Sequence, residues 1–546
     1  MSECSYLQKI RQSYQPKLPK ILQKIGKLKT ETCDIETPAK NELAELFPKT
    51  LGQPKVEFVK GSDQNHQSLR VGVVLSGGQA AGGHNIITGL LDGLKKLNPS
   101  SCLFGFLNGP SGIVDNESIK LTETAIADFR NQGGFDLIGA GRTKIETPEQ
   151  FEGAANTAKK LQLDGMVIVG GDDSNTNAAL LAEYFETHNI PTRVIGAPKT
   201  IDGDLKNDQI EISFGFDTAT KTFSETIGNI LRDSLSAKKY YFFIKLMGRS
   251  ASHIALECAL QTHPNLTFIG EEIAAEQKTL QDLTNQICDM ISARADLGKN
   301  YGVVLIPEGI VEFIPEFKEL IIELNRLHLD PSQSREEKVA YVKKQLRLSS
   351  RKCFESIPSE IQAQLLIDRD PHGNIQVSKI ETERLFVQTV KEELKKRKNA
   401  GTYKGKFSAQ PLFCGYEGRS GFPSNFDAQY CYALGHVAAL LIDSGATGYM
   451  SCVQNLTRPV EDWRISGIPL TSMIHMEERK GQVKPVIQKA LVELSGKPFT
   501  IFKEQRENWA MNDDYRYPGP IQFFGPTEIT DSITLTLETQ KVAAYV

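Results

Sequence analysis

From residue 70 onward, short runs of apolar and mostly β-branched residues recur along the chain, and each ends in glycine or a polar turn. The runs cover 71–75, 166–169, 194–197, 241–246 and 303–306. They are continuously apolar rather than alternating, and most are followed by a helical pattern, as at 254–260. Continuous apolar strands alternating with helices predict an α/β fold with a mainly parallel sheet covered on both faces. In such sheets ligands bind beyond the carboxyl ends of the strands, where all five turns fall.

A different pattern occupies residues 311–400. Phe317, Leu320, Ile321 and Leu324 follow the i, i+3, i+4, i+7 spacing of an amphipathic helix, and 385–396 has the same spacing. The block has many charged residues and few strand signals, so we expect a helical insertion between α/β segments.

The N-terminal stretch 6–28 is basic and amphipathic, but Pro16 and Pro19 interrupt any helix there. No apolar core follows Met1, so a secretory signal peptide is not expected. We expect a docking arm over 1–69, with an import signal as the alternative.

Composition narrows the function classes. The 546 residues contain 63 Lys and Arg against 67 Asp and Glu, which gives no general attraction to nucleic acid or membranes. No apolar run approaches the ~20 residues of a membrane span. The nine cysteines are scattered without a CxxC pair, as expected of reduced thiols in a cytoplasmic protein.

The first candidate site is the glycine-rich stretch 75–85, which follows the first apolar run. Glycines such as Gly78 let backbone N–H groups approach phosphate oxygens, and the helix that follows adds a favourable partial charge. The stretch is neither a Walker A loop nor a G-x-G-x-x-G motif. A tight structural turn is the alternative.

Paired carboxylates mark the second candidate site. Asp172 and Asp173 follow two glycines at a strand end, and adjacent carboxylates repel one another unless a cation lies between them. Magnesium is held in this way, by one or two carboxylates together with phosphate oxygens. The alternative is a helix cap, which accounts for one acidic residue but not for both.

Alternating acids mark the third candidate site. Asp202 and Asp204 flank Gly203 three residues after Lys199. One carboxylate can accept a hydroxyl proton while the other helps to hold a metal, and the lysine can stabilise charge on a transferring phosphoryl group. A solvated Asx turn is the alternative.

Three further turns offer groups suited to a phosphorylated ligand. They contain Arg249 in Met-Gly-Arg, Glu308 in Pro-Glu-Gly, and Arg419 in the glycine-rich stretch 415–421. Taken singly, each is as compatible with an ordinary surface or structural turn.

In combination these motifs resemble those of the phosphofructokinase family. GGDDS, PKTIDGD, MGRS, PEG and GYEGR occur in the order of that family over residues 70–500, and they are most similar to the long pyrophosphate-dependent form. The resemblance implies two Rossmann-like parallel-sheet domains with a helical insertion and an N-terminal arm. It also implies reversible phosphoryl transfer from pyrophosphate to fructose 6-phosphate, with Mg²⁺ as cofactor.

The resemblance assigns roles residue by residue. Gly78 would bind diphosphate, Asp172 would hold Mg²⁺, and Asp202 would take the proton of the acceptor hydroxyl. Asp173 and Lys199 stand where ATP-dependent relatives carry glycine, so they would select pyrophosphate, and Lys199 would also stabilise the transition state. The residues implied for the sugar-phosphate site are Thr200, Ile201, Asp202, Met247, Gly248, Arg249, Glu308, Tyr416, Glu417, Gly418 and Arg419.

Lys239 and Tyr240 would reach that site from a neighbouring subunit, which implies a homodimer with a shared active site. ATP-dependent relatives carry Arg where Tyr240 stands.

The implied domains are a phosphate-donor domain over 70–213, completed by about 420–505, and a fructose 6-phosphate domain over 214–418. Residues 506–546 form a C-terminal segment. Three other functions stay open: an ATP-dependent sugar-phosphate kinase, a non-catalytic regulatory subunit, and a dinucleotide-binding or NAD-kinase-like protein that shares only the Gly-Gly-Asp turn.

Overall fold

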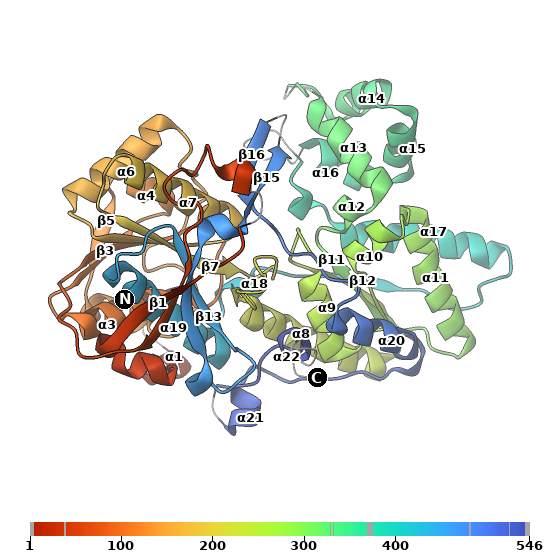
Figure 1. The fold of residues 1–546 in the computed structure, drawn as a ribbon. Helices are drawn as coiled ribbons and strands as arrows, with labels where there is room; N and C mark the ends of the chain where they lie inside the picture. Colours follow the sequence, from red (N-terminus) through yellow and green to blue (C-terminus); the bar gives the residue numbers. More distant parts are fainter. Residues whose placement is uncertain are drawn as a thin grey trace. The chain divides into compact units, whose positions relative to one another are not determined.

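The computed structural model describes residues 5–37, 40–327, 329–330, 332–367, 375–479, 482–523 and 525–540. The chain divides into two compact units, each built from separated segments (Figure 1). Unit 1 comprises 1–219, 417–490 and 522–541, and unit 2 comprises 220–416, 491–521 and 542–546. Each unit is described by itself.

Unit 1 is built on a mixed sheet with a parallel centre. Its strands run in the order β1-β2-β14-β13-β7-β6-β3-β4-β5, and the neighbours from β13 to β4 are parallel. The outer pairs are antiparallel. The strands are β1 (Leu28–Cys33), β2 (Lys55–Lys60), β3 (Arg70–Leu75), β4 (Cys102–Phe106), β5 (Ser118–Leu121), β6 (Gly165–Gly170), β7 (Arg193–Thr200), β13 (Tyr449–Gln454) and β14 (Arg464–Pro469), with β8 (Phe214–Gly215) beside β7.

Helices cover both faces of this sheet, as the continuous apolar strands predicted. On one face α6 (Pro148–Lys160) and α7 (Asp172–Thr187) pack over a core that includes Met166 and Ile168 (Figure 1). On the other face lie α3 (Gly83–Leu97) and α19 (Asn425–Asp443), which pack against each other. They approach closely because a Cβ on Gly89 or Gly435 would overlap the backbone of the facing helix.

Shorter elements complete unit 1. They are α1 (Tyr6–Ser13), α2 (Lys40–Leu43), α4 (Pro110–Val114), α5 (Glu123–Ile126), α18 (Glu417–Ser420), α21 (Thr527–Thr530), α22 (Leu535–Gln540), the hairpin β15 (Ile474–Arg479) and β16 (Gln482–Ile487), and the 3₁₀ turns η1 (Lys20–Lys27), η2 (Ala127–Phe129), η4 (Val460–Asp462) and η5 (Leu470–Met473).

Unit 2 contains a four-stranded sheet in the order β10-β11-β9-β12, with every pair parallel. Its strands are β9 (Tyr241–Leu246), β10 (Leu266–Thr267), β11 (Gly302–Pro307) and β12 (Ala409–Cys414). Its helices are α8 (Phe216–Ala237, which begins in unit 1), α9 (His253–Thr262), α10 (Gly270–Ala275), α11 (Leu280–Asp296) and α20 (Lys497–Asn512). The prediction of an α/β fold with mainly parallel sheets is therefore confirmed.

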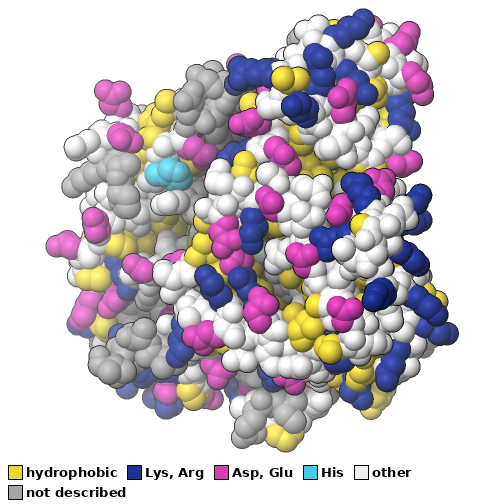
Figure 2. Space-filling model, turned by 90° about the vertical axis from the view of Figure 1, so that its right-hand side faces the viewer, with side chains coloured by type: hydrophobic (Ala, Val, Ile, Leu, Met, Phe, Trp, Pro, Cys, Tyr) yellow, Lys and Arg dark blue, Asp and Glu magenta, His cyan; other side chains and the backbone are white. Residues whose placement is uncertain are grey.

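The insertion is helical, as predicted. It contains α12 (Ile310–Phe313), α13 (Pro315–Arg326), α14 (Arg335–Gln345), α15 (Leu348–Ser356), α16 (Ser359–Ile367), η3 (Val377–Lys379) and α17 (Thr382–Asn399). The four residues that α13 buries are the four with the predicted amphipathic spacing: Phe317, Leu320, Ile321 and Leu324. Positive and negative side chains are interspersed over the face drawn in Figure 2, in keeping with the near balance of charges.

The unit boundaries differ from the implied domains at several points, of which two involve long segments. Residues 28–60, expected to belong to an arm, add β1 and β2 to the sheet of unit 1. Residues 491–505, expected to complete the donor domain, lie in unit 2. Among the described residues, no helix is both long enough and apolar enough to cross a membrane.

Candidate active site

Three of the predicted site turns follow neighbouring strands of unit 1. The strands β3, β6 and β7 lie side by side, with Leu75 opposite Val169 and Gly170 opposite Pro198. The turns after these strands are therefore adjacent, as the sequence predicted. One boundary was wrong, because β7 continues through Lys199 and Thr200 rather than ending at 197.

The glycine turn after β3 forms one wall of an open pocket of about 420 Å³. Gly77 has a φ of 85°, which favours glycine, and its N–H donates to the carbonyl of Gly141 at 2.8 Å. The pocket is lined by Gly77, Gly78, Gln79, Gly134, Phe135, Asp136, Gly139, Ala140, Gly141, Arg142 and Arg419. Gly78 leaves room for an arginine, since a Cβ there would clash with the Arg419 guanidinium.

Three cationic side chains converge on this turn. The Lys199 Nζ donates to the carbonyl of Gly78 at 2.6 Å, and the side chain is buried. Burial, followed by the charge of Arg419, lowers the pKa of Lys199 to about 8; Arg142 acts in the same direction, whereas Asp202 and Asp172 oppose it. An anion would offset the two arginine charges that oppose the charging of Lys199, so this part of unit 1 is suited to phosphate groups.

The acidic pair after β6 lies in the first turn of α7. Gly171 is the N-cap residue and no side chain caps the helix, so the alternative interpretation of Asp172 or Asp173 as a cap is wrong. Both carboxylates have a cationic neighbour. Lys144 Nζ lies 3.3 Å from Asp173 Oδ1, and Lys489 Nζ lies 3.5 Å from Asp172 Oδ2.

The turn after β7 carries the two alternating acids. Gly203 has a φ of 74°, which lets the chain reverse direction between Asp202 and Asp204. The Asp202 N–H donates to the Thr200 hydroxyl at 3.0 Å. Asp204 is only 5% exposed, so a fully solvated Asx turn is excluded. Burial, and after it the Asp202 carboxylate, raises the pKa of Asp204 to about 7.

The carboxylates of unit 1 fit a magnesium ion that also binds phosphate. Asp172 and Asp204 are close enough for one ammonium, that of Lys489, to lie 3.5 and 3.7 Å from their oxygens. Within the described ranges no three His, Cys, Asp or Glu side chains form a complete metal cage. Magnesium needs no such cage, because it keeps several waters and takes substrate oxygens as ligands.

The three other predicted turns follow neighbouring strands of unit 2. Leu246 at the end of β9 lies opposite both Pro307 and Cys414. The Gly248 N–H donates to Glu308 Oε2 at 3.2 Å, and a Cβ on Gly309 would overlap the carbonyl of Arg249. The Met-Gly-Arg and Pro-Glu-Gly turns are therefore in contact, with the Arg249 side chain exposed and the Glu308 side chain buried.

The GYEGR motif lies across the division between the units. Tyr416 belongs to unit 2 and is 71% exposed, whereas Glu417, Gly418 and Arg419 form most of α18 in unit 1. Arg419 Nε donates to the carbonyl of Gln79 at 3.3 Å, so this guanidinium lies against the glycine turn. In unit 2, Lys239 is exposed and Tyr240 is half-buried against Phe242.

Sequence reasoning missed Arg142, Lys144 and Lys489. The stretch Gly139-Ala140-Gly141 before Arg142 was an available signal, because its glycines resemble those of the other turns. Lys489 follows a separate two-stranded hairpin that no pattern predicted, so its place beside Asp172 depends on the tertiary fold alone.

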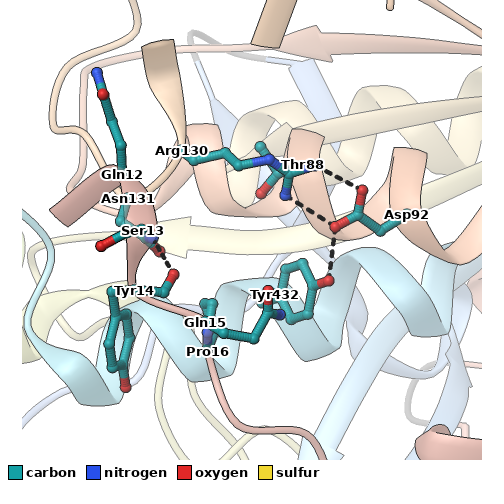
Figure 3. A pocket seen from close by; sticks show the side chains of 10 residues that line it. All are labelled: Gln12, Ser13, Tyr14, Gln15, Pro16, Thr88, Asp92, Arg130, Asn131 and Tyr432. Carbon is teal, nitrogen blue, oxygen red and sulfur yellow. Dashed lines mark hydrogen bonds and ion pairs between the residues drawn. The ribbon is translucent and has the colours of Figure 1, made fainter. Parts of the chain in front are cut away.

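A second cavity in unit 1, of about 140 Å³, is internally neutral (Figure 3). Arg130 donates to both oxygens of Asp92 at 2.8 and 2.9 Å, and the Tyr432 hydroxyl donates to the same carboxylate at 2.7 Å. Because these charges compensate one another, the cavity is less suited to an anion than the pocket beside Gly78.

Comparisons with known proteins agree with the geometry. The family model described as "Phosphofructokinase" matches residues 70–442. The pyrophosphate–fructose 6-phosphate 1-phosphotransferase of Treponema pallidum is 51% identical over 99% of this chain and 98% of its own length. The beta 1 subunit of the enzyme of that name from Arabidopsis thaliana is 53% identical over 95% of this chain and 92% of its own length.

A solved structure shares the fold. The crystal structure of the pyrophosphate-dependent phosphofructokinase from Nitrosospira multiformis has a TM-score of 0.54 and 15% sequence identity, and the match covers 82% of this chain and 93% of that one.

Proposed function

Because the chain belongs to the phosphofructokinase family, we propose that it transfers a phosphoryl group from pyrophosphate to the C1 hydroxyl of fructose 6-phosphate. The products are fructose 1,6-bisphosphate and phosphate, as in glycolysis, and the reverse reaction serves gluconeogenesis. One phosphoanhydride is consumed for each ester formed, so we expect a readily reversible reaction.

One observation carries the proposal: Lys199, Arg142 and Arg419 converge on Gly77 and Gly78. Cations that depress the charging of a buried lysine need an anion to offset them. A diphosphate supplies charged oxygens without the base and ribose of a nucleotide. Asp173 and Lys199 are the residues that the family resemblance associates with a pyrophosphate donor.

In the proposed mechanism, the residues of unit 1 bind the donor and remove one proton. The backbone at Gly78 and the cations of Lys199 and Arg142 hold the diphosphate. Asp202 accepts the proton of the C1 hydroxyl as its oxygen attacks the terminal phosphorus, and Lys199 stabilises the charge that develops on the transferring group. Positioning and charge neutralisation supply most of the rate enhancement in such reactions.

Asp172, with Asp204 beside it, would hold Mg²⁺. When bound, the ion would neutralise charge on the donor oxygens and help to orient them. The support for this assignment is the pair of carboxylates that share the ammonium of Lys489.

The remaining residues bind the acceptor. Arg249 and Glu308 would contact the sugar phosphate together with Met247 and Gly248, because the two turns that carry them touch. The other proposed acceptor residues are Thr200, Ile201, Tyr416, Glu417, Gly418 and Arg419. Arg419 also lies against the glycine turn after β3, which supports the proposal that it contacts the phosphoryl group in transfer.

We also propose a cytoplasmic homodimer in which Lys239 and Tyr240 reach the site of the neighbouring copy. The exposure of Lys239 and the free thiols of the described cysteines support these assignments.

The decisive experiment supplies pyrophosphate and ATP in parallel to the purified chain. We expect turnover with pyrophosphate and a kcat/KM for ATP lower by about 10²-fold or more. A ratio of that size corresponds to a difference of about 2.7 kcal/mol in transition-state stabilisation between the two donors. The double variant Asp173→Gly, Lys199→Gly should lose pyrophosphate activity and gain some ATP activity. Lys55→Met is the matched control, since Lys55 forms an ion pair with Glu57 on β2 and belongs to none of the proposed binding sites.

Three results would contradict the proposal. A wild-type preference for ATP would favour the ATP-dependent kinase, and an absence of turnover with either donor would favour a regulatory subunit. NAD binding with no effect of pyrophosphate on stability would favour the dinucleotide-binding alternative.

A further inference from the structure

The ammonium of Lys489 occupies the position of a bridging cation between two carboxylates. Its Nζ lies 3.5 Å from Asp172 Oδ2 and 3.7 Å from Asp204 Oδ2, and the side chain is 32% exposed. Neither distance is that of a tight charge-assisted hydrogen bond, for which about 2.7–2.9 Å is usual. The ammonium is therefore shared between the acids rather than fixed to one.

The backbone around Lys489 is anchored to the same segments that carry the acids. Two residues before it, the Ile487 N–H donates to the hydroxyl of Thr176 on α7, the helix that begins at Asp172. One residue after it, the Ala490 N–H donates to the carbonyl of Asp204 at 2.7 Å. The fold thus aims this side chain at the two acids.

A cation is needed at this point of the chain. The carboxylates of Asp172 and Asp204 lie close enough together to share one ammonium, and Asp202 adds a third carboxylate two residues before Asp204. Repulsion among carboxylates would turn the side chains apart unless a positive charge offset it. In the absence of metal, the ammonium can keep the side chains of Asp172 and Asp204 directed toward a common point.

We propose that Lys489 is a positioning residue that holds the two metal-binding carboxylates as their counter-ion until Mg²⁺ displaces its ammonium. The inference rests on the proposed function, because it takes Asp172 and Asp204 as the metal ligands. It adds that metal binding is a competition between the ion and a residue of the chain. Lys489 then lowers the metal affinity of the empty enzyme while keeping its ligands in place.

The alternative is an ordinary ion pair at a partly exposed position, which contributes little. The two readings differ in their effect on metal affinity. If the ion pair only orders the ligands, replacement of Lys489 should weaken metal binding. If the ammonium competes with the metal, replacement of Lys489 should strengthen metal binding.

The test titrates the purified full chain with Mn²⁺ and no substrate, and follows free Mn²⁺ by electron paramagnetic resonance. Lys489→Met should bind Mn²⁺ roughly tenfold more tightly, because a unit positive charge within a few ångströms of the ion is removed. Lys489→Arg keeps the charge and should resemble wild type. Lys55→Met loses a lysine from an ion pair elsewhere in unit 1 and should also resemble wild type.

A double-variant comparison with Asp204→Asn distinguishes competition for the carboxylates from an effect of Lys489→Met on folding. In the Asp204→Asn background the ammonium has one acid fewer to compensate, so adding Lys489→Met should change Mn²⁺ affinity by no more than about twofold. Circular dichroism and thermal melting verify folding, and Lys489→Gln replaces Lys489→Met if the latter does not fold.

Equal or weaker Mn²⁺ binding by Lys489→Met than by wild type overturns the inference and leaves the proposed function intact. Mn²⁺ binding that survives Asp172→Asn unchanged removes the assigned metal ligand, so it overturns that part of the proposed function and the inference with it.

Discussion

Asp202 combines the three properties required of the proposed base. It is half-buried, it follows a strand end at the centre of the unit 1 sheet, and its charge acts on both Lys199 and Asp204. Asp202→Asn keeps the shape and removes the proton acceptor, so we expect kcat to fall by ~10²-fold or more. Calorimetric binding of fructose 6-phosphate should change little.

The matched control for this substitution is Asp208→Asn, a nearby exposed acid. It should leave kcat and binding as in wild type. A kcat for Asp202→Asn within tenfold of wild type would mean that another group accepts the proton.

Lys199 makes diphosphate binding depend on pH in a defined direction. Burial and Arg419 lower the pKa of this lysine from 10.5 to about 8 in the empty pocket. The ammonium therefore carries an unfavourable contribution to stability below about pH 8, and this contribution is relieved as the pH rises from about 8 to 10.5. Bound diphosphate favours the ammonium, so binding above pH 8 must take up a proton.

We expect diphosphate binding to take up about half a proton at pH 8 and close to one at pH 9 on account of this group. Isothermal calorimetry in two buffers of different ionisation enthalpy measures the uptake, and the apparent affinity should fall as the pH rises through about 8. Lys199→Arg is the control, because its guanidinium stays charged and reports the protons contributed by diphosphate itself. Equal proton uptake in the two proteins would contradict the assignment.

At the scale of elements, the N-terminal segment is bonded to residues that lie next to the loops lining the proposed donor pocket. Arg11 on α1 is fully buried, with Nη1 donating to Asn425 Oδ1 at 2.9 Å and Nη2 to the carbonyl of Pro423 at 3.0 Å. Asn131 donates to the carbonyl of Arg11 at 2.9 Å. Because Arg419 lies shortly before Pro423, we infer that α1 helps to hold its loop.

Arg11→Met should lower the free energy of unfolding by about 2–4 kcal/mol, because it leaves buried polar partners unsatisfied. It should also raise the KM for pyrophosphate by roughly three- to tenfold, by loosening the loop of Arg419. Denaturant unfolding and steady-state kinetics measure the two effects.

Lys9→Met is the matched control, since Lys9 is exposed on the same helix. It should change neither quantity. A loss of stability in Arg11→Met with an unchanged KM for pyrophosphate would mean that the segment stabilises unit 1 without positioning the donor loop.

The elements that the sequence predicted correctly are those whose pattern follows from burial. Strands such as β6, buried along their whole length, must be continuously apolar, and α13 must show its apolar stripe. Edge strands obey no such requirement. In β1 only Leu28 is buried, so polar residues fill a strand that periodicity cannot detect.

The same reasoning separates the predicted from the missed site residues. Asp172, Asp202 and Gly78 stand directly after buried strands, where the parallel sheet dictates that polar groups gather. Arg142 comes from a loop that meets the turn after β3 at a bridge between Ser76 and Gly141, and no buried strand precedes it directly. Lys489 follows a separate two-stranded hairpin, so the acids beside it can be identified only from the tertiary fold.

For the whole molecule, the proposed roles are divided between units assembled from separated segments. The donor residues Asp172 and Lys199 belong to unit 1, and the acceptor residues Arg249 and Glu308 belong to unit 2. The chain passes from one unit to the other inside the GYEGR motif, between Tyr416 and Glu417. Truncation at a single boundary cannot isolate either unit, because each contains segments from beyond the other.

Lys239 allows the proposed sharing between two copies to be tested in the intact protein. This lysine is exposed on unit 2, whereas Asp202 lies in unit 1. If Lys239 serves the site of a neighbouring copy, a dimer of one Lys239→Ala chain and one Asp202→Asn chain has one site with both defects and one with neither. Random pairing of equal amounts makes half of the dimers mixed, so activity should recover to about a quarter of wild type.

Co-expression with two affinity tags, light scattering and the pyrophosphate assay measure this recovery. The matched control pairs Asp202→Asn with Lys199→Ala, two defects on the same unit, and this mixture should stay inactive because every site keeps one of them. Failure of the Lys239→Ala mixture to exceed its parents, in particles of dimer mass, would assign Lys239 to its own chain. Recovery in the first mixture but not the second requires that the lysine cross from one copy to the other, since no other pairing yields an intact site.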